Sequence, residues 1–179
     1  ASRGLGDVYK RQVLNFVTIS SSYKESRNNI LKLINIHADS DNVQLQVGFY
    51  DSNVNWGTTK MSTMITSENT EAGTASWTQN TSYQQRNATA DTPLGYGLGN
   101  EAGENAAGEF RLFSPSSTTF YCDFTSNVAY NMNTNGSRLS MVAGYCLSAS
   151  NAVTGIRFGM SSGTFDGTIK MYGLTKCQN

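Results

Sequence analysis

Apolar and polar residues alternate along much of this chain with a period of two. Between residues 43 and 49 every odd position is apolar, and positions 44 and 46 are both glutamine. Such alternation predicts a strand with one face against a core. The same pattern recurs at residues 120–124, 139–147, 156–160 and 169–172. Residues 30–36 are more continuously apolar, which is typical of a strand covered on both faces, and residues 13–20 give a weaker strand pattern.

Turn-forming residues separate these stretches. Asp39–Asn42 lies between two of them, and Asn133–Gly136 ends in the Asn-Gly pair that favours tight hairpins. No stretch has a convincing helical period. We therefore predict an all-β fold, an antiparallel β-sandwich of jelly-roll type with about 8–10 strands.

Two segments depart from this pattern. Residues 51–107 are rich in Ser, Thr, Asn, Gln and Gly, and we expect two or three irregular strands joined by long surface loops. Residues 4–12 resemble a peptide that recurs as translated adaptor sequence in environmental gene assemblies. Residues 1–12 are therefore left out of the fold prediction, and residues 13–179 are predicted to form a single domain.

Charge and hydropathy exclude two classes of partner. Thirteen basic and thirteen acidic side chains give a formal net charge of zero, whereas nucleic-acid binding needs a basic face. An apolar run of about 18 residues, which a transmembrane helix requires, is missing from the sequence, and the first dozen residues lack the apolar centre of a signal peptide. We expect neither nucleic-acid binding nor membrane insertion.

The three cysteines are Cys122, Cys146 and Cys177. An odd number in separate segments is no disulfide framework. Cys122 and Cys146 could pair if their strands are neighbours, and the alternative is a pair of buried free thiols.

The residues that could carry chemistry are few. The single histidine, His37, has no evident partner for nucleophilic catalysis, and one histidine with three scattered cysteines predicts no zinc site. Asp39, Asp41 and Asn42 could supply oxygen ligands to calcium, but the same residues are ordinary turn formers. We expect no cofactor.

A glycosidase would need two carboxylates across a cleft. Glu101, Glu104 and Glu109 are close in sequence and Asp91 is nearby, but solvated loops also carry such residues.

Four aromatic residues in polar surroundings are the candidate ligand-binding residues: Trp56, Trp77, Tyr83 and Tyr96. Flat rings can stack on the C–H faces of sugars while neighbouring amides bind the hydroxyls. The alternative is that these rings fill the core beneath long loops.

Several motifs are similar to those of a domain repeated in marine bacteriophage structural proteins. They lie at residues 16–25, 33–37, 41–42, 108–119, 156–158, 161–163 and 167–174. The resemblance covers most of residues 16–175, although residues 26–29 are more polar than that pattern. It implies a jelly-roll-like sandwich at the distal end of a trimeric tail fibre, exposed on the virion surface. The family offers no catalytic residues to carry over.

These observations lead to one expected function and two alternatives. We expect a non-catalytic virion surface domain that binds a host-surface glycan or receptor and contacts other virion proteins. A structural role in head decoration or fibre trimerisation predicts instead a large apolar patch on one face. A polysaccharide-degrading β-sandwich enzyme predicts paired carboxylates in a cleft.

Overall fold

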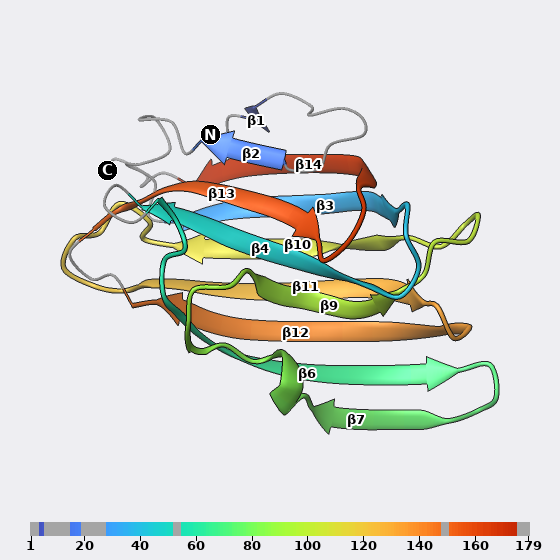
Figure 1. Ribbon diagram of the computed structural model, residues 1–179. Helices are drawn as coiled ribbons and strands as arrows, with labels where there is room; N and C mark the ends of the chain where they lie inside the picture. The colour runs from blue at the N-terminus through green and yellow to red at the C-terminus, as the bar shows by residue number, and fades with distance from the viewer. Residues whose placement is uncertain (1–3, 6–14, 19–27, 52–54, 148–150, 175–179) are drawn as a thin grey trace.

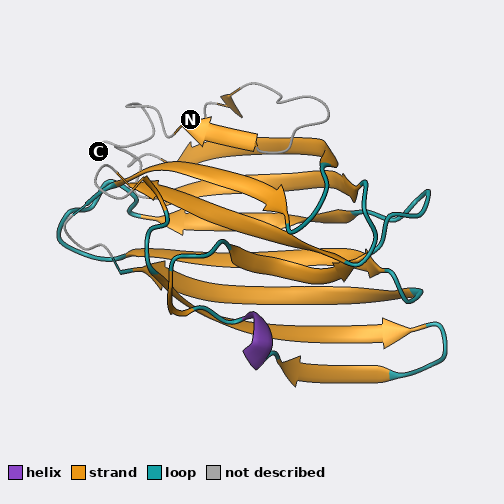
Figure 2. Ribbon diagram, viewed as in Figure 1, coloured by secondary structure: helices purple, strands orange, loops and turns teal. Residues whose placement is uncertain are grey.

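A computed structural model of the protein describes residues 4–5, 15–18, 28–51, 55–147 and 151–174. Within these ranges the chain consists of strands and connecting loops, apart from one turn of 3-10 helix, η1 (Thr81–Tyr83) (Figure 2). No helix in the described ranges has the length and apolarity of a membrane span. The prediction of an all-β fold is confirmed.

The strands form two layers that face each other (Figure 1). The larger sheet contains, in spatial order, β1 (Gly4–Leu5), β14 (Phe165–Leu174), β3 (Asn28–Ala38), β10 (Ala106–Phe113), β11 (Cys122–Met132), β12 (Gly136–Cys146) and β6 (Lys60–Thr70), with β7 (Ala75–Gln79) and β8 (Arg86–Ala88) both paired to β6. The smaller sheet contains β2 (Asn15–Thr18), β13 (Val153–Met160), β4 (Val43–Asp51) and β9 (Thr92–Leu98), with β5 (Asn55–Trp56) paired to β4. The two sheets are joined by one bridge, Met132 to Leu98.

Every strand pairing among the described residues is antiparallel, and nine of these strands have seven or more residues. The antiparallel β-sandwich is therefore confirmed. The jelly-roll winding stays a prediction. In the sequence, β4 and β13 both lie between β3 and β14. The pairs β3–β14 and β4–β13 are therefore nested one inside the other, as a jelly-roll winding requires. In contrast, β10, β11 and β12 follow one another within a single sheet.

The core between the layers is built around phenylalanine rings. Phe49 of β4 lies 5.1 Å from Phe124 of β11 and 6.1 Å from Phe110 of β10, measured between ring centroids. Phe158 of β13 meets Phe110 edge-on at 5.8 Å. These contacts join strands from both sheets, so Phe49, Phe124 and Phe158, which are apolar positions of the alternating pattern, pack across the interface as that pattern predicts.

The predicted turns are confirmed. Asp39–Asn42 joins β3 to β4, and Asn133–Asn135 closes the β11–β12 hairpin. Asn42 and Asn135 have φ values of 55° and 54°. Asparagine is one of the few residues other than glycine that adopts this left-handed conformation at low cost, which explains its place in both turns.

Two predictions about the strands are wrong in part. Residues 51–107 contain an eleven-residue strand, β6, and a regular β6–β7 hairpin, so this segment is less irregular than expected. Residues 30–36 were expected to be covered on both faces, but Ile34 is 39% exposed. The reason is the same in both places: one face of the larger sheet is open to solvent, so it accepts Ser, Thr and Asn and leaves some apolar side chains exposed.

Candidate functional site on the outer face of the larger sheet

The side of the larger sheet that points away from the smaller sheet is called the outer face below. On β12 the apolar stripe of Leu139, Met141, Ala143 and Tyr145 lies on this face, while the buried residues of the strand alternate with it. The alternation therefore predicts the strand correctly, but it does not predict which of its two faces is buried. On β12 the more apolar face is the one that lies outside the core.

Trp77 is the most exposed of the four candidate aromatic residues, with 64% of its surface in contact with solvent. It lies on the outer face of β7, opposite Ser67 of β6, and Ser67 in turn lies opposite Leu139 of β12. Of the described strands, β6 alone pairs with β7, so Trp77 stands at an edge of the sheet. Its ring is thus available to a ligand that lies across the outer face.

A groove of about 470 Å³ lies on the outer face, and the β6 residues that line it, Thr63 and Ile65, precede Ser67, the residue opposite Trp77. Its lining mixes apolar and polar side chains of four strands, among them Thr63, Ile65, Arg111, Phe113, Asn127 and Met141. Ile65, Met141 and Asn127 are neighbours in one row across β6, β12 and β11. The groove can therefore take an apolar surface and also supply hydrogen bonds along the same row.

A polar pocket of about 600 Å³ lies towards the other end of β6, where Asn69 and Thr70 follow Ser67. The side chains that line it include Asn69, Glu71, Glu101, Glu104, Asn131 and Ser137. Three of them, Asn131, Ser137 and Asn69, are neighbours in one row of the outer face. This pocket offers mainly hydrogen-bonding groups.

The outer face of β6 connects the pocket to the groove. Along this strand Asn69 lines the pocket, Ser67 lies opposite Trp77, and Ile65 and Thr63 line the groove. Alternate residues of a strand are about 7 Å apart, so the strip from Asn69 to Thr63 is about 20 Å long. Trp77 stands beside the middle of this strip, which has room for an extended ligand.

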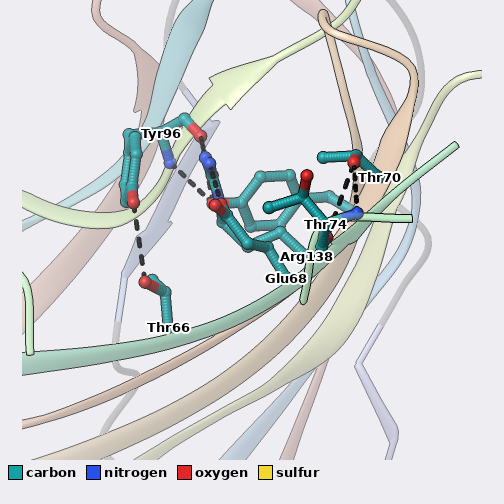
Figure 3. Close-up of polar contacts among 7 residues, drawn as sticks. Thr66, Glu68, Thr70, Thr74, Tyr96 and Arg138 are labelled. Atoms are coloured by element: carbon teal, nitrogen blue, oxygen red, sulfur yellow. Dashed lines mark hydrogen bonds and ion pairs between the residues drawn. The ribbon is translucent and has the colours of Figure 1, made fainter. Parts of the chain in front are cut away.

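Tyr83 and Tyr96 lie together, but away from Trp77. Their rings are stacked with centroids 4.2 Å apart, and both rings are partly buried against the core. The guanidinium carbon of Arg138 lies 4.1 Å from the centroid of Tyr96 (Figure 3). Both faces of Tyr96 are thus occupied by neighbours within the protein, which is the behaviour expected of a structural aromatic residue.

Trp56 lies in a third place, beside the smaller sheet. Its ring is 5.3 Å from that of Tyr50, and the guanidinium carbon of Arg157 is 4.9 Å from its centroid. Arg157 also makes two hydrogen bonds to the carboxylate of Asp91, at 2.9 and 3.0 Å. The four candidate rings are therefore neither one binding surface nor one buried cluster.

Arg138 is the centre of a charged cluster at the Tyr83–Tyr96 stack. Its Nε donates a hydrogen bond to Glu68 Oε2 at 2.8 Å, and its Nη1 donates to the carbonyl oxygen of Tyr96 at 2.8 Å (Figure 3). The hydroxyl of Tyr130 donates to the same carbonyl at 3.0 Å. Hydrogen bonding from Arg138 lowers the pKa of Glu68, and burial raises the pKa of Tyr130 to about 12. The cluster is a structural clamp between β6, β9 and β12, and the sequence contains no local signal for it.

Glu68→Gln is expected to lower stability at neutral pH, by an amount that shrinks as the pH falls. The pKa of Glu68 in the folded protein lies below its ordinary value of 4.5. The stabilisation from its ionised form is therefore complete above pH 4.5 and is lost as the pH falls through the lower, folded-state pKa. Urea unfolding of wild type and variant between pH 7 and pH 3 measures the difference. The exposed Glu71→Gln variant controls for the loss of a carboxylate, and a difference that is constant with pH would contradict this prediction.

The four carboxylates considered for a hydrolase have other neighbours. Glu101 and Glu104 line the polar pocket, where Glu104 Oε2 accepts a hydrogen bond from the backbone nitrogen of Glu101 at 2.7 Å. Glu109 lies on the outer face and forms ion pairs with Lys32 and Arg111. Asp91, paired with Arg157 as described above, belongs to a different region.

The candidate calcium ligands lie at a turn. Asp39 accepts a hydrogen bond from the backbone nitrogen of Thr164 at 2.7 Å and one from Ser40 Oγ at 3.2 Å. Its carboxylate thereby ties the β3–β4 turn to the β13–β14 connection. Asp41 is exposed, and Asn42 has the left-handed conformation noted above. In the part of the chain that the structure describes, no three or more His, Cys, Asp or Glu side chains are grouped so that they could hold a metal ion.

The geometry defines an all-β sandwich with an open, mixed polar and apolar sheet face. Comparison of the chain with protein-family models, with curated proteins and with solved structures gives no match.

Proposed function

We propose that this protein is a non-catalytic surface domain that binds glycan along the outer face of its larger sheet, with Trp77 at the centre of the site. The observation that carries this proposal is the position of Trp77, which is exposed at the sheet edge opposite Ser67, between the β6 residues that line the polar pocket and those that line the mixed groove. Of the four aromatic residues expected to bind a ligand, only Trp77 belongs to the proposed site, and it lies on a strand of the sheet, β7.

The chemistry of the strip suits a neutral oligosaccharide. An indole ring can stack on the apolar C–H face of a pyranose. Side chains such as Asn69, Ser67 and Thr63 can exchange hydrogen bonds with ring hydroxyls on the same side. The chain has no net charge, so binding would depend on stacking and hydrogen bonds more than on attraction between charges. A strip about 20 Å long favours several sugar units over a single sugar.

The resemblance of the sequence to marine bacteriophage structural proteins supports a place for this domain on a virion. Stacking on one tryptophan gives weak binding at each site. If the domain is a trimer on a fibre, several weak sites would act together and raise the overall affinity by their high effective concentration. We therefore propose host-surface glycan as the partner and the virion surface as the location.

Assembly is the second candidate function, and one observation favours it. The exposed large hydrophobic residues of the described chain all lie on the outer face or in the segment that leads into β11: Ile34, Trp77, Phe120, Tyr121, Leu139 and Leu174. Trp77 and Leu139 lie in one row with Ser67, and exposed apolar side chains that are near one another suit a protein–protein contact. A neighbouring subunit or another virion protein would cover this face in that case.

Trp77→Ala is expected to weaken glycan binding roughly tenfold or more, because it removes the apolar area that the sugar would cover. A glycan-array screen of the wild type identifies the best ligand, and titration calorimetry then compares the variants. Phe120→Ala is a matched control, since Phe120 is 73% exposed but lies outside the strip, and it should bind as the wild type does.

Two results would contradict the proposal. One is a bound glycan whose affinity Trp77→Ala leaves unchanged. The other is a screen without any ligand, combined with self-association that Trp77→Ala and Leu139→Ala abolish in light scattering. The second result would favour assembly.

A further inference from the structure

Cys122 and Cys146 lie directly opposite each other in the sheet. Cys122 is the first residue of β11 and Cys146 is the last residue of β12, and the register pairs the two Cα atoms. Both side chains point into the core, with exposed fractions of 4% and 0%, and both thiols are free. The β11–β12 hairpin thus carries one thiol at each of its two open ends.

This register places the two Cα atoms within the separation that a disulfide can span. Residues that face each other in an antiparallel pair have Cα atoms about 4.5–5.5 Å apart, within the range of about 4.4–6.8 Å that disulfides span. The two thiols are also close enough to share a hydrogen bond, which together with burial raises the pKa of Cys122 well above its ordinary value. Neither strand has to shift its register for a bond to form.

Lys60 distinguishes the two thiols. It pairs with Cys146 across β6 and β12, and its buried Nζ donates hydrogen bonds to the carbonyl oxygens of Thr58 and Thr89 at 2.7 and 3.1 Å. Both cysteines lie at strand ends, where local opening gives reagents access to them.

We propose that Cys122 and Cys146 form a cross-strand disulfide that closes the open ends of the β11–β12 hairpin under oxidising conditions. One of the two cysteines, as the thiolate, attacks one sulfur of a small disulfide such as oxidised glutathione, and the first glutathione thiolate leaves and takes up a proton. The thiolate of the other cysteine then attacks the Sγ atom of the mixed disulfide, and the second glutathione leaves as a thiolate and takes up a proton. The two protein thiols lose two electrons and two protons, and glutathione disulfide is reduced to two thiols.

The test compares the disulfide equilibrium in the folded and unfolded chain. In a Cys177→Ser background, the protein is equilibrated with glutathione buffers of known ratio, with and without denaturant. Mass spectrometry after alkylation gives the oxidised fraction. The oxidised fraction in each buffer gives the effective concentration of one cysteine thiol at the other. Because the fold holds the two thiols together, this effective concentration should be at least roughly tenfold higher in native buffer than in denaturant. By linkage, the oxidised protein should also have the higher melting temperature.

A matched control moves one thiol to the opposite face. Cys146→Ala combined with Tyr145→Cys places the thiol one residue away, on the outer face, where it is out of reach of Cys122. This variant should oxidise less readily when folded than when unfolded. The proposal is overturned if the original pair shows the same or a lower effective concentration in the folded state, or if oxidation lowers its melting temperature. Either result is independent of glycan binding.

Discussion

Phe49→Ala is expected to lower the free energy of unfolding by about 4 kcal/mol, because it removes a fully buried ring and leaves a cavity. Phe49 has no exposed surface and packs against both Phe110 and Phe124. It belongs to the smaller sheet, whereas its two partners belong to the larger one. The cavity would therefore open at the junction of the layers, where neither sheet can close it without moving the other.

Urea unfolding followed by tryptophan fluorescence measures this loss. Phe120→Ala removes the same ring from an exposed position and should change stability by only about 0.5 kcal/mol or less. Equal stability of the two variants would contradict the burial of Phe49 between the two sheets.

Arg138→Ala is expected to cost about 3 kcal/mol of stability, since it breaks a largely buried ion pair and leaves one charge without its partner. The side chain of Arg138 is 12% exposed and that of Glu68 is 24% exposed. The substitution also removes the cation from the face of Tyr96 and the donor from the carbonyl of that residue. Arg138→Lys should recover only part of the loss, because an ammonium cannot reach the carboxylate and the carbonyl with the planar geometry of a guanidinium.

Thermal unfolding of both variants, with Arg86→Ala as an exposed arginine control, tests this expectation. A loss from Arg138→Ala of about 0.5 kcal/mol or less is usual for a solvated ion pair. Such a result would show that the clamp between β6, β9 and β12 contributes little.

The sequence predicts the strands well because period two is a local property. The alternation at Val43–Phe49 gives β4 its buried face directly, and the Asn-rich turns give the hairpins. Which face of a strand is buried depends on the other layer. That is why the stripe from Leu139 to Tyr145 could not be assigned to the outer face from its own pattern.

The candidate site was predictable only in part, for the same reason. Trp77 stands out in a polar segment, and the structure leaves it exposed. Tyr96 stands out equally, but Tyr83 of the same segment and Arg138, which is distant in sequence, cover its faces. The residues around Tyr96 in the sequence do not indicate that a cation from another strand covers its ring. Exposed and enclosed aromatic residues therefore cannot be distinguished from the sequence alone.

The pairing of β3 with β14 has a consequence for how the chain folds. Asn28 pairs with Leu174, so β3 obtains one of its two neighbours only after all the strands that lie between it and β14 in the sequence have been made. Contacts between such distant segments slow folding, because the loop between them must close before the pairing stabilises anything. During synthesis this edge of β3 would therefore stay unpaired until β14 has been made, and the pairing of β3 with β14 would form later than the hairpins between them.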